Sequence, residues 1–279
     1  MRAGRTFALG RGSSMDCSPS ALLVVDRSRC YGIDVGNFPD AAATAVNGSR
    51  HNIWKSMNTL FTEELMGRIH RTGVIAVLVV DRVEDAVPLA RALVAGGIDV
   101  MELTLRTPAA FDALKRITIE VPQMTAGIGT VITPEQVNQV KEAGAAFGMA
   151  PGMNPLVVRE AHRVGLPFAP GIATPSDIEQ ALGCRCRLLK YFPAEACGGM
   201  EYLKSMSAPY AHLNLKYIPL GGLNANNVET YLEEPIVHAL GGSWIAPRDL
   251  VKKQDWTAIT VNARQASEIV AKARSRAIV

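Results

Sequence analysis

Short apolar runs alternate with longer segments of helical pattern along most of this chain, and this alternation restricts the possible folds more than any other feature. The rhythm begins near Leu60 and continues almost to the C-terminus. Eight apolar runs occur, at residues 74–80, 98–105, 124–129, 145–150, 166–171, 187–192, 215–220 and 236–242. Eight alternating strand and helix units predict an α/β protein of the (β/α)8 TIM barrel class.

The segments between the runs carry helix-start signals. Several open with Thr-Pro or Asn-Pro, as in TPEQVNQV (residues 133–140), NPLVVREA (154–161) and TPSDIEQAL (174–182). Such residues favour the first turn of a helix because they cap free backbone N–H groups or lack one. A doubly wound open sheet is the alternative fold, but no glycine-rich dinucleotide loop follows the first run.

Residues 1–56 differ from the rest of the chain. They are rich in Gly, Ser, Arg and Asn, and their apolar run at 21–25 is too short for a signal-peptide core. We expect a poorly ordered extension ahead of a domain at 57–279 that opens with a helix at Met57. A transit peptide is one alternative, because the first fifteen residues carry arginines and no acid. An artefact of start-site choice is the other, because Met57 opens a well-patterned helix.

Composition excludes several classes of protein. The chain is 48% hydrophobic and 20% charged with a net charge of +3, which is ordinary for a globular protein and too small to indicate nucleic-acid binding. No apolar stretch reaches the roughly 18 residues of a membrane helix. The five cysteines are odd in number, so we expect reduced thiols, a cytoplasmic location and no metal at Cys184-x-Cys186.

Polar side chains on the second run indicate where chemistry occurs. In ELTLR (residues 102–106), alternation puts Glu102, Thr104 and Arg106 on one face and two leucines on the other. The leucines suit packing under helices, so the polar trio is expected to face the barrel lumen at the C-terminal strand ends, where this fold places active sites. A structural salt bridge is the alternative reading.

One lysine lies in the otherwise apolar sixth run. Lys190 is in phase with Leu188 and Phe192, and runs two and six face each other across an eight-stranded ring, so Lys190 should meet Glu102. Desolvation penalises a charged lysine, and a neutral amine can attack a ketone while a nearby carboxylate moves the protons. The alternative is a lysine that reaches solvent from a strand end.

Glycine pairs follow the seventh and eighth runs, in PLGGLN (219–224) and LGGSW (240–244). Backbone N–H groups of such loops converge on phosphate, and this fold usually binds phosphate there. Ser243 can add a hydroxyl, and tight turns alone are the alternative. GIGT (127–130) and APG (150–152) complete the predicted rim, where Thr130 can bind an anion near Arg106.

At these residues the chain resembles the class I aldolase family that acts on 2-keto-3-deoxy-6-phosphogluconate (KDPG) and 4-hydroxy-2-oxoglutarate (KHG). GIDVMELTLR (97–106) matches the family's glutamate segment, and LLKYFPAEACGG (188–199) resembles its Schiff-base segment. GIGTV, APGM, GGLN and GGSW follow in the family's order. The resemblance covers about residues 60–270 and excludes the N-terminal extension.

The resemblance implies that Lys190 forms a Schiff base with the C2 carbonyl of a phosphorylated 2-keto-3-deoxy sugar acid and that Glu102 is the general acid and base. Arg106 and Thr130 are implied to hold the substrate carboxylate. The remaining residues implied in the site are the pocket residues Pro151, Phe192 and Leu220 and the phosphate-binding residues Gly221, Gly222, Gly242 and Ser243. A homotrimer without metal or organic cofactor is also implied.

The chain departs from the family pattern at three positions. Tyr191 replaces the usual Phe or Leu, Arg185 replaces a glycine, and Leu220 stands where the gluconate enzymes usually carry Thr. The last change keeps the galactonate epimer of KDPG open as the substrate. A phosphosugar-binding regulatory protein without turnover is the rival from another class.

Overall fold

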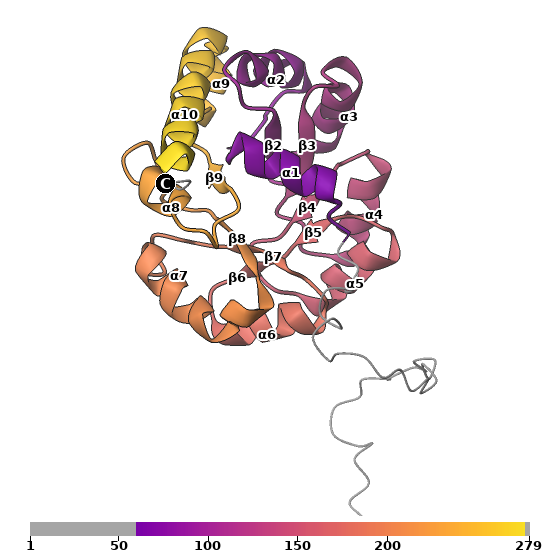
Figure 1. The fold of residues 1–279 in the computed structure, drawn as a ribbon. Helices are drawn as coiled ribbons and strands as arrows, with labels where there is room; N and C mark the ends of the chain where they lie inside the picture. The colour runs from indigo at the N-terminus through magenta and orange to yellow at the C-terminus, as the bar shows by residue number, and fades with distance from the viewer. Residues whose placement is uncertain (1–59, 277–279) are drawn as a thin grey trace, which may run out of the picture. The chain divides into compact units, whose positions relative to one another are not determined.

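The computed structural model describes residues 60–276, which fall within one compact unit of the chain. Figure 1 shows parallel strands surrounded by helices. The strands are β1 (Val74–Leu78), β2 (Val100–Thr104), β3 (Thr125–Gly129), β4 (Gly148–Met149), β5 (Phe168–Ala169), β6 (Gly171–Ile172), β7 (Leu188–Tyr191), β8 (Lys216–Pro219) and β9 (Leu240–Gly242). Each of the eight predicted runs contains a strand, and a second strand, β6, begins at the last residue of the fifth run.

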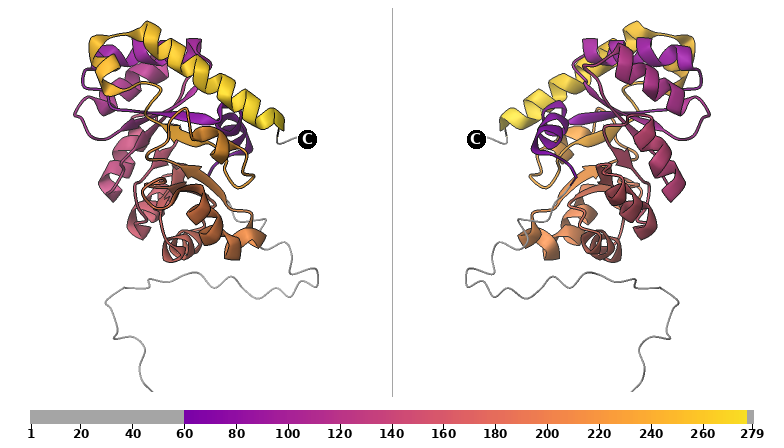
Figure 2. Two further views of the ribbon diagram at one scale, coloured as in Figure 1. Left: turned by 90° about the vertical axis from the view of Figure 1, so that its left-hand side faces the viewer. Right: turned by 90° about the vertical axis from the view of Figure 1, so that its right-hand side faces the viewer.

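The first helix precedes β1, and the other helices come after successive strands. The helices are α1 (Glu63–Thr72), α2 (Ala86–Ala95), α3 (Ala110–Glu120), α4 (Pro134–Glu142), α5 (Pro155–Arg163), α6 (Pro175–Gly183), α7 (Gly199–Ser207), α8 (Val228–Leu232), α9 (Arg248–Lys253) and α10 (Trp256–Arg276), with 3₁₀ turns η2 (Val83–Asp85) and η3 (Ala208–Leu213). Helix α10 packs along α2 and α8, as the side views of Figure 2 show. No helix between residues 60 and 276 is both long enough and apolar enough to span a membrane.

The helix starts follow the signals in the sequence. Thr133 caps α4 and Thr174 caps α6, each in a reciprocal capping box with proline in the first turn, and Asn154 caps α5. The first helix is an exception. It begins at Glu63, where Thr62 accepts a hydrogen bond from the Leu65 N–H, and not at Met57 as predicted. Residues 1–59, which include the predicted extension, lie outside the described part of the chain.

All paired strands are parallel, and they form two sheets. One has the order β5-β4-β3-β2-β1-β9 and the other the order β6-β7-β8. Pro170 separates β5 from β6, because proline has no N–H to continue a ladder. The predicted α/β class is confirmed, with strands curled into a half-barrel, whereas the predicted eight-stranded ring is not present as one continuous sheet.

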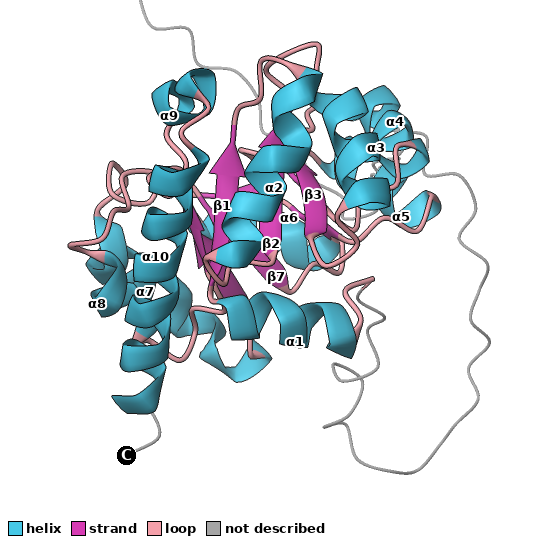
Figure 3. Cartoon of the chain, turned by 90° about the horizontal axis from the view of Figure 1, so that it is seen from above, coloured by secondary structure: helices cyan, strands magenta, loops and turns pink. Residues whose placement is uncertain are grey.

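Two apolar clusters divide the core between the faces of the strands. Side chains such as Leu103 pack outward under the helices, while Ile75, Val100 and Leu188 belong to an inner cluster. Helix α1 lies below the N-terminal ends of β1 and β2 and contributes Ile69 to the inner cluster (Figure 3). The inner cluster leaves the opposite, C-terminal ends of the strands free for a site.

Candidate active site

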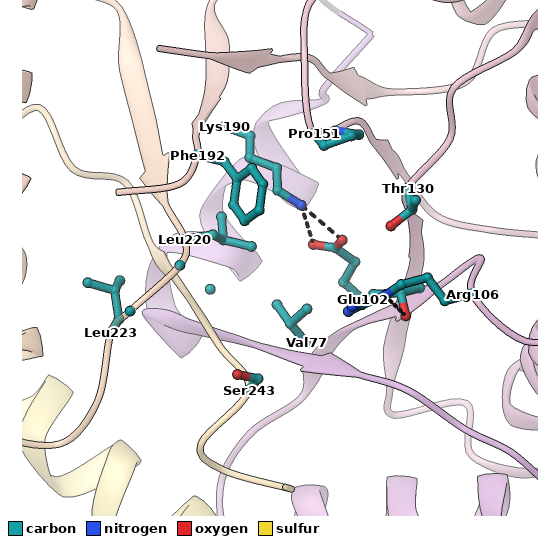
Figure 4. Close-up of a pocket in the computed structure, with 14 residues that line it drawn as sticks. Val77, Glu102, Arg106, Thr130, Pro151, Lys190, Phe192, Leu220, Leu223 and Ser243 are labelled. Atoms are coloured by element: carbon teal, nitrogen blue, oxygen red, sulfur yellow. Dashed lines mark hydrogen bonds and ion pairs between the residues drawn. The ribbon is translucent and has the colours of Figure 1, made fainter. Parts of the chain in front are cut away.

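A cavity of about 330 Å³ opens at the C-terminal ends of the strands. Every predicted site residue lines it except Gly242, and the lining also includes Val77, Thr104, Leu223 and Gly241. Figure 4 places Thr130 and Arg106 on one side of the cavity, and Leu220, Leu223 and Ser243 on the other. The cavity therefore has one polar end at Arg106 and Thr130. At the other end Ser243 and the glycine loops supply the polar groups, and two leucines also line the wall.

Lys190 and Glu102 meet in the middle of this cavity. Lys190 Nζ lies 3.1 Å from Oε1 and 3.4 Å from Oε2 of Glu102 (Figure 4). The residues are 5% and 0% exposed, so the pair is desolvated. The Lys190 N–H donates to the Pro170 carbonyl, which fixes the backbone of β7 at this point. The prediction that alternation brings the two side chains together across the lumen is confirmed.

The geometry suits carbonyl chemistry. An amine and a carboxylate within hydrogen-bond reach form a nucleophile and a proton carrier. The Phe192 ring centre lies 5.6 Å from Lys190 Nζ, so an apolar ring borders the amine on that side. Burial of the pair is costly unless the two charges remain matched, so each group constrains the other.

Gly129 makes room for the Glu102 carboxylate. It pairs with Thr104 on the neighbouring strand, and a Cβ atom at this position would overlap Oε1 of Glu102. A glycine in a strand interior often marks such a close approach. The sequence motifs did not predict this role. An inward-facing glycine next to a strand with a predicted catalytic residue could have indicated that space is needed there.

Arg106 lies at the polar end of the cavity near Thr130. Its Nε donates to Thr104 Oγ1 at 3.2 Å, and Thr104 in turn donates to the Leu78 carbonyl. No described carboxylate lies within ion-pair distance of Arg106. The exposed guanidinium is therefore available to an anion.

Thr130 has an unusual backbone conformation. Its φ of 63° is in the left-handed region, which is rare for a β-branched residue and costs free energy. Such strain tends to be retained at functional sites. The conformation follows directly after β3, at the rim of the cavity.

Glycine backbone forms much of the opposite end of the cavity. Gly221 and Gly222 have φ values of 98° and 81°, and this conformation brings the loop after β8 close to the segment after β7. The Glu195 N–H donates to the Gly221 carbonyl, and the side chain of Glu195 packs against Gly222. Tyr231 donates a hydrogen bond to that carboxylate. Burial is the main cause that raises the pKa of the Tyr231 hydroxyl, so it remains a donor.

Of the two glycines on β9, Gly242 was expected in the site, but Gly241 is the one that lines the cavity. Gly241 lines the cavity beside Leu220, whereas the side-chain position of Gly242 is filled by the Trp244 ring. Alternation along β9 explains the difference, because adjacent residues face opposite sides. Ser243 lines the cavity as predicted.

Two of the three departures from the family pattern, Tyr191 and Leu220, differ in whether they reach the cavity. Tyr191 is buried in the outer core, where its hydroxyl donates to the Gly199 carbonyl, so the change does not reach the cavity. Leu220 is 3% exposed and lines the cavity wall. Among the described residues no group of three or more potential metal ligands occurs.

Comparison with known proteins identifies the family. A model of the KDPG and KHG aldolase family matches residues 65–262. The chain belongs to this family. It is 42% identical over 202 residues to the 2-dehydro-3-deoxy-phosphogluconate aldolase of Treponema pallidum, covering 72% of this chain and 95% of the relative. It is 40% identical over 195 residues to the KHG/KDPG aldolase of Escherichia coli K12, covering 70% and 91%.

Solved structures of KDPG aldolases have the same fold. That of Legionella pneumophila, with pyruvate captured at low pH as a covalent carbinolamine, is 40% identical with a TM-score of 0.69 and covers 72% of this chain and 97% of that one. That of Zymomonas mobilis with 3-phosphoglycerate is 36% identical with a TM-score of 0.69, covering 74% and 96%. The aldolase family suggested by the sequence motifs is thereby confirmed.

Proposed function

We propose that this protein is a class I aldolase that cleaves KDPG to pyruvate and glyceraldehyde 3-phosphate and also accepts KHG. The buried contact between Lys190 and Glu102 carries the proposal, because Schiff-base chemistry requires an amine and a proton carrier side by side. The names of the family relatives support the substrate class. The carbinolamine in the Legionella enzyme supports the covalent route.

In the proposed reaction, Lys190 first transfers a proton to Glu102 and becomes a neutral amine. Nζ attacks C2 of the substrate to form a carbinolamine, and Glu102 protonates its hydroxyl, which leaves as water. The product is an iminium ion, the Schiff base. Direct contact between the two groups allows these proton transfers without a bulk water intermediate.

Cleavage then uses the iminium as an electron sink. A base, for which Glu102 is proposed, removes the C4 hydroxyl proton, the C3–C4 bond breaks, and its electron pair enters the iminium to form an enamine. The aldehyde, glyceraldehyde 3-phosphate, departs. Protonation at C3 and hydrolysis of the new iminium release pyruvate and regenerate the Lys190 amine.

The two polar ends of the cavity fit the two ends of this substrate. Arg106 and Thr130 are proposed to hold the carboxylate beside C2. The loops with Gly221, Gly222 and Ser243 are proposed to hold the 6-phosphate, with Gly242 contributing only through its backbone. Pro151, Phe192 and Leu220 form the walls between them.

Leu220 favours a second candidate substrate, the galactonate epimer of KDPG. Its side chain offers no hydrogen bond to a C4 hydroxyl in either configuration, so the cavity wall does not select the gluconate form strongly. A regulatory phosphosugar-binding protein is disfavoured, since binding alone gives no reason to bury a lysine against a carboxylate.

We also propose the architecture around this site. Pro170 alone separates β5 from β6, and the pairs Tyr217–Val237 and Leu220–Gly241 link β8 to the β9 segment, which supports a closed eight-stranded barrel. A homotrimer and a cytoplasmic location are retained from the family resemblance and the cysteine pattern. Light scattering of the purified chain tests the trimer.

Pyruvate release tests the proposed activity. KDPG, its galactonate epimer and KHG are each supplied, and pyruvate is measured with lactate dehydrogenase. We expect turnover of KDPG and a lower kcat/KM for KHG, which lacks the phosphate that the glycine loops bind. Binding of KDPG without pyruvate release would favour the regulatory alternative.

A further inference from the structure

A second cavity lies at the opposite ends of the strands. Its volume is about 220 Å³, and it shares no lining residue with the active-site cavity. Phe168, Leu188 and Lys216, which line it, are the first residues of β5, β7 and β8. Met66 of α1 lines it as well. The cavity therefore belongs to the N-terminal end of the strands and takes no part in the proposed aldolase reaction.

The lining of this lower cavity is strongly positive. Arg185, Arg187 and Lys216 carry charge, His162 adds an imidazole, and no aspartate or glutamate occurs among the described lining residues. Neither Arg185 nor Lys216 is within ion-pair distance of a described carboxylate. Lys216 Nζ donates one hydrogen bond to the Pro235 carbonyl at 2.8 Å and keeps two further N–H donors. Burial, and after it the charge of Arg185, lowers the pKa of His162, so the imidazole is less readily protonated.

The backbone of Arg185 is unusual. Its φ is 61°, a left-handed conformation that arginine rarely adopts and that glycine takes without strain. The residue follows α6, where chains often use glycine to leave a helix. The turn itself gives no reason for an arginine. Its guanidinium, however, adds charge to the mouth of the cavity.

The cavity is also amphipathic. Arg185 is exposed and Lys216 half-buried, whereas Phe61, Phe168 and Leu188 are buried and form an apolar floor. Drug-sized pockets usually measure about 300–1,000 Å³, so a ligand here must be small. We infer that the lower cavity is a second binding site for a small organic anion, with an apolar body against Phe168 and Leu188 and a carboxylate or phosphate at Arg185 and Lys216.

Photolabelling with 4-azidobenzoate, an aromatic carboxylate of the inferred class, tests this site on the full chain. After irradiation and digestion, we expect saturable label on peptides that contain Phe168 or Met66. Unlabelled benzoate should compete with it. Label confined to peptides of the active-site cavity, or no saturable label, would overturn the inference.

Arg185→Gly provides a sharp variant because glycine suits the φ of 61° and should not weaken the fold. Loss of one charge-assisted contact should reduce labelling about tenfold, and Lys216→Gln should act in the same direction. Arg91→Gln, an exposed cation outside both cavities, is the matched control and should label as the parent does. Equal labelling of Arg185→Gly and the parent would contradict the site.

Discussion

At the scale of single residues, the contact between Lys190 and Glu102 decides the chemistry. Glu102→Gln keeps the shape of the side chain but cannot carry protons as a carboxylate does. General acid and base catalysis is typically worth about 10²- to 10⁴-fold, so kcat for KDPG should fall by that factor. Glu201→Gln, at an exposed position on α7, is the control and should retain full activity. A kcat near that of the parent, in a folded variant, would make Glu102 a structural partner only.

Leu220 is expected to set the preference between C4 epimers. Leu220→Thr adds a hydroxyl to the cavity wall, which can hydrogen-bond one configuration of the C4 hydroxyl. An apolar wall discriminates by about 10²-fold at most, so the parent should accept both epimers. The variant should raise kcat/KM for KDPG relative to the galactonate epimer. Strong gluconate selectivity in the parent, unchanged in the variant, would show that position 220 does not contact C4.

At the scale of elements, the pairing of β2 with β3 positions the catalytic carboxylate. Gly129→Ala places a methyl group where Glu102 Oε1 now lies, so the carboxylate must turn away from Lys190. A shift of about 1 Å can cost about 10²-fold in rate. We expect a loss of kcat of that order together with a lower urea midpoint, because Lys190 then stays buried without a matched carboxylate. Gly183→Ala is the control, because open space surrounds that position and its φ is not left-handed.

The same alternation explains what the sequence could predict about these elements. Inward residues recur every second position, so the strand pattern by itself assigns Glu102, Lys190 and Phe192 to the lumen. The split of the fifth run at Pro170 was missed because short strands depend on which neighbours pair. The start of α1 at Glu63 depends on the Thr62 cap, which the apolar pattern does not reveal.

The sequence predicted most residues that line the cavity, but not the glycines that leave space for the lining side chains. Residues that line the cavity with polar groups carry a chemical signal in the sequence. Gly129 and Gly241 act by leaving space for Glu102 and Leu220, and such space is defined only by the packed partner. Alternation along β9 separates Gly241, which lines the cavity, from Gly242, which faces Trp244.

At the scale of the whole molecule, the pair formed by His70 of α1 and His238, which lies just before β9, makes stability depend on pH. The ring centroids of His70 and His238 are 5.1 Å apart, His238 Nε2 lies 2.9 Å from the Met66 carbonyl oxygen, and Arg274 donates to the His238 carbonyl. Burial is the largest cause that lowers the pKa of His238 to about 4, with smaller contributions from His70, Lys216 and Arg274.

The sign of the effect follows from linkage. The unfolded chain binds a proton at a histidine pKa of about 6.5, but folded His238 does so only near 4, so stability should fall as pH decreases through that interval. His238→Gln keeps a donor for Met66 and removes the titration. It should flatten the change in urea midpoint between pH 6.5 and 4.5, whereas exposed His212→Gln should not. An equal slope in His238→Gln and the parent would contradict this account.

Trapping with pyruvate and borohydride tests the central claim most directly. Reduction of a Schiff base fixes the pyruvate carbons to the amine as a stable adduct that mass spectrometry can locate. We predict one modified peptide, the one that contains Lys190, and no adduct in Lys190→Arg, because a guanidinium stays protonated and cannot attack a carbonyl. An adduct on Lys204 or Lys216 in place of Lys190, or no adduct in the parent protein, would contradict the account.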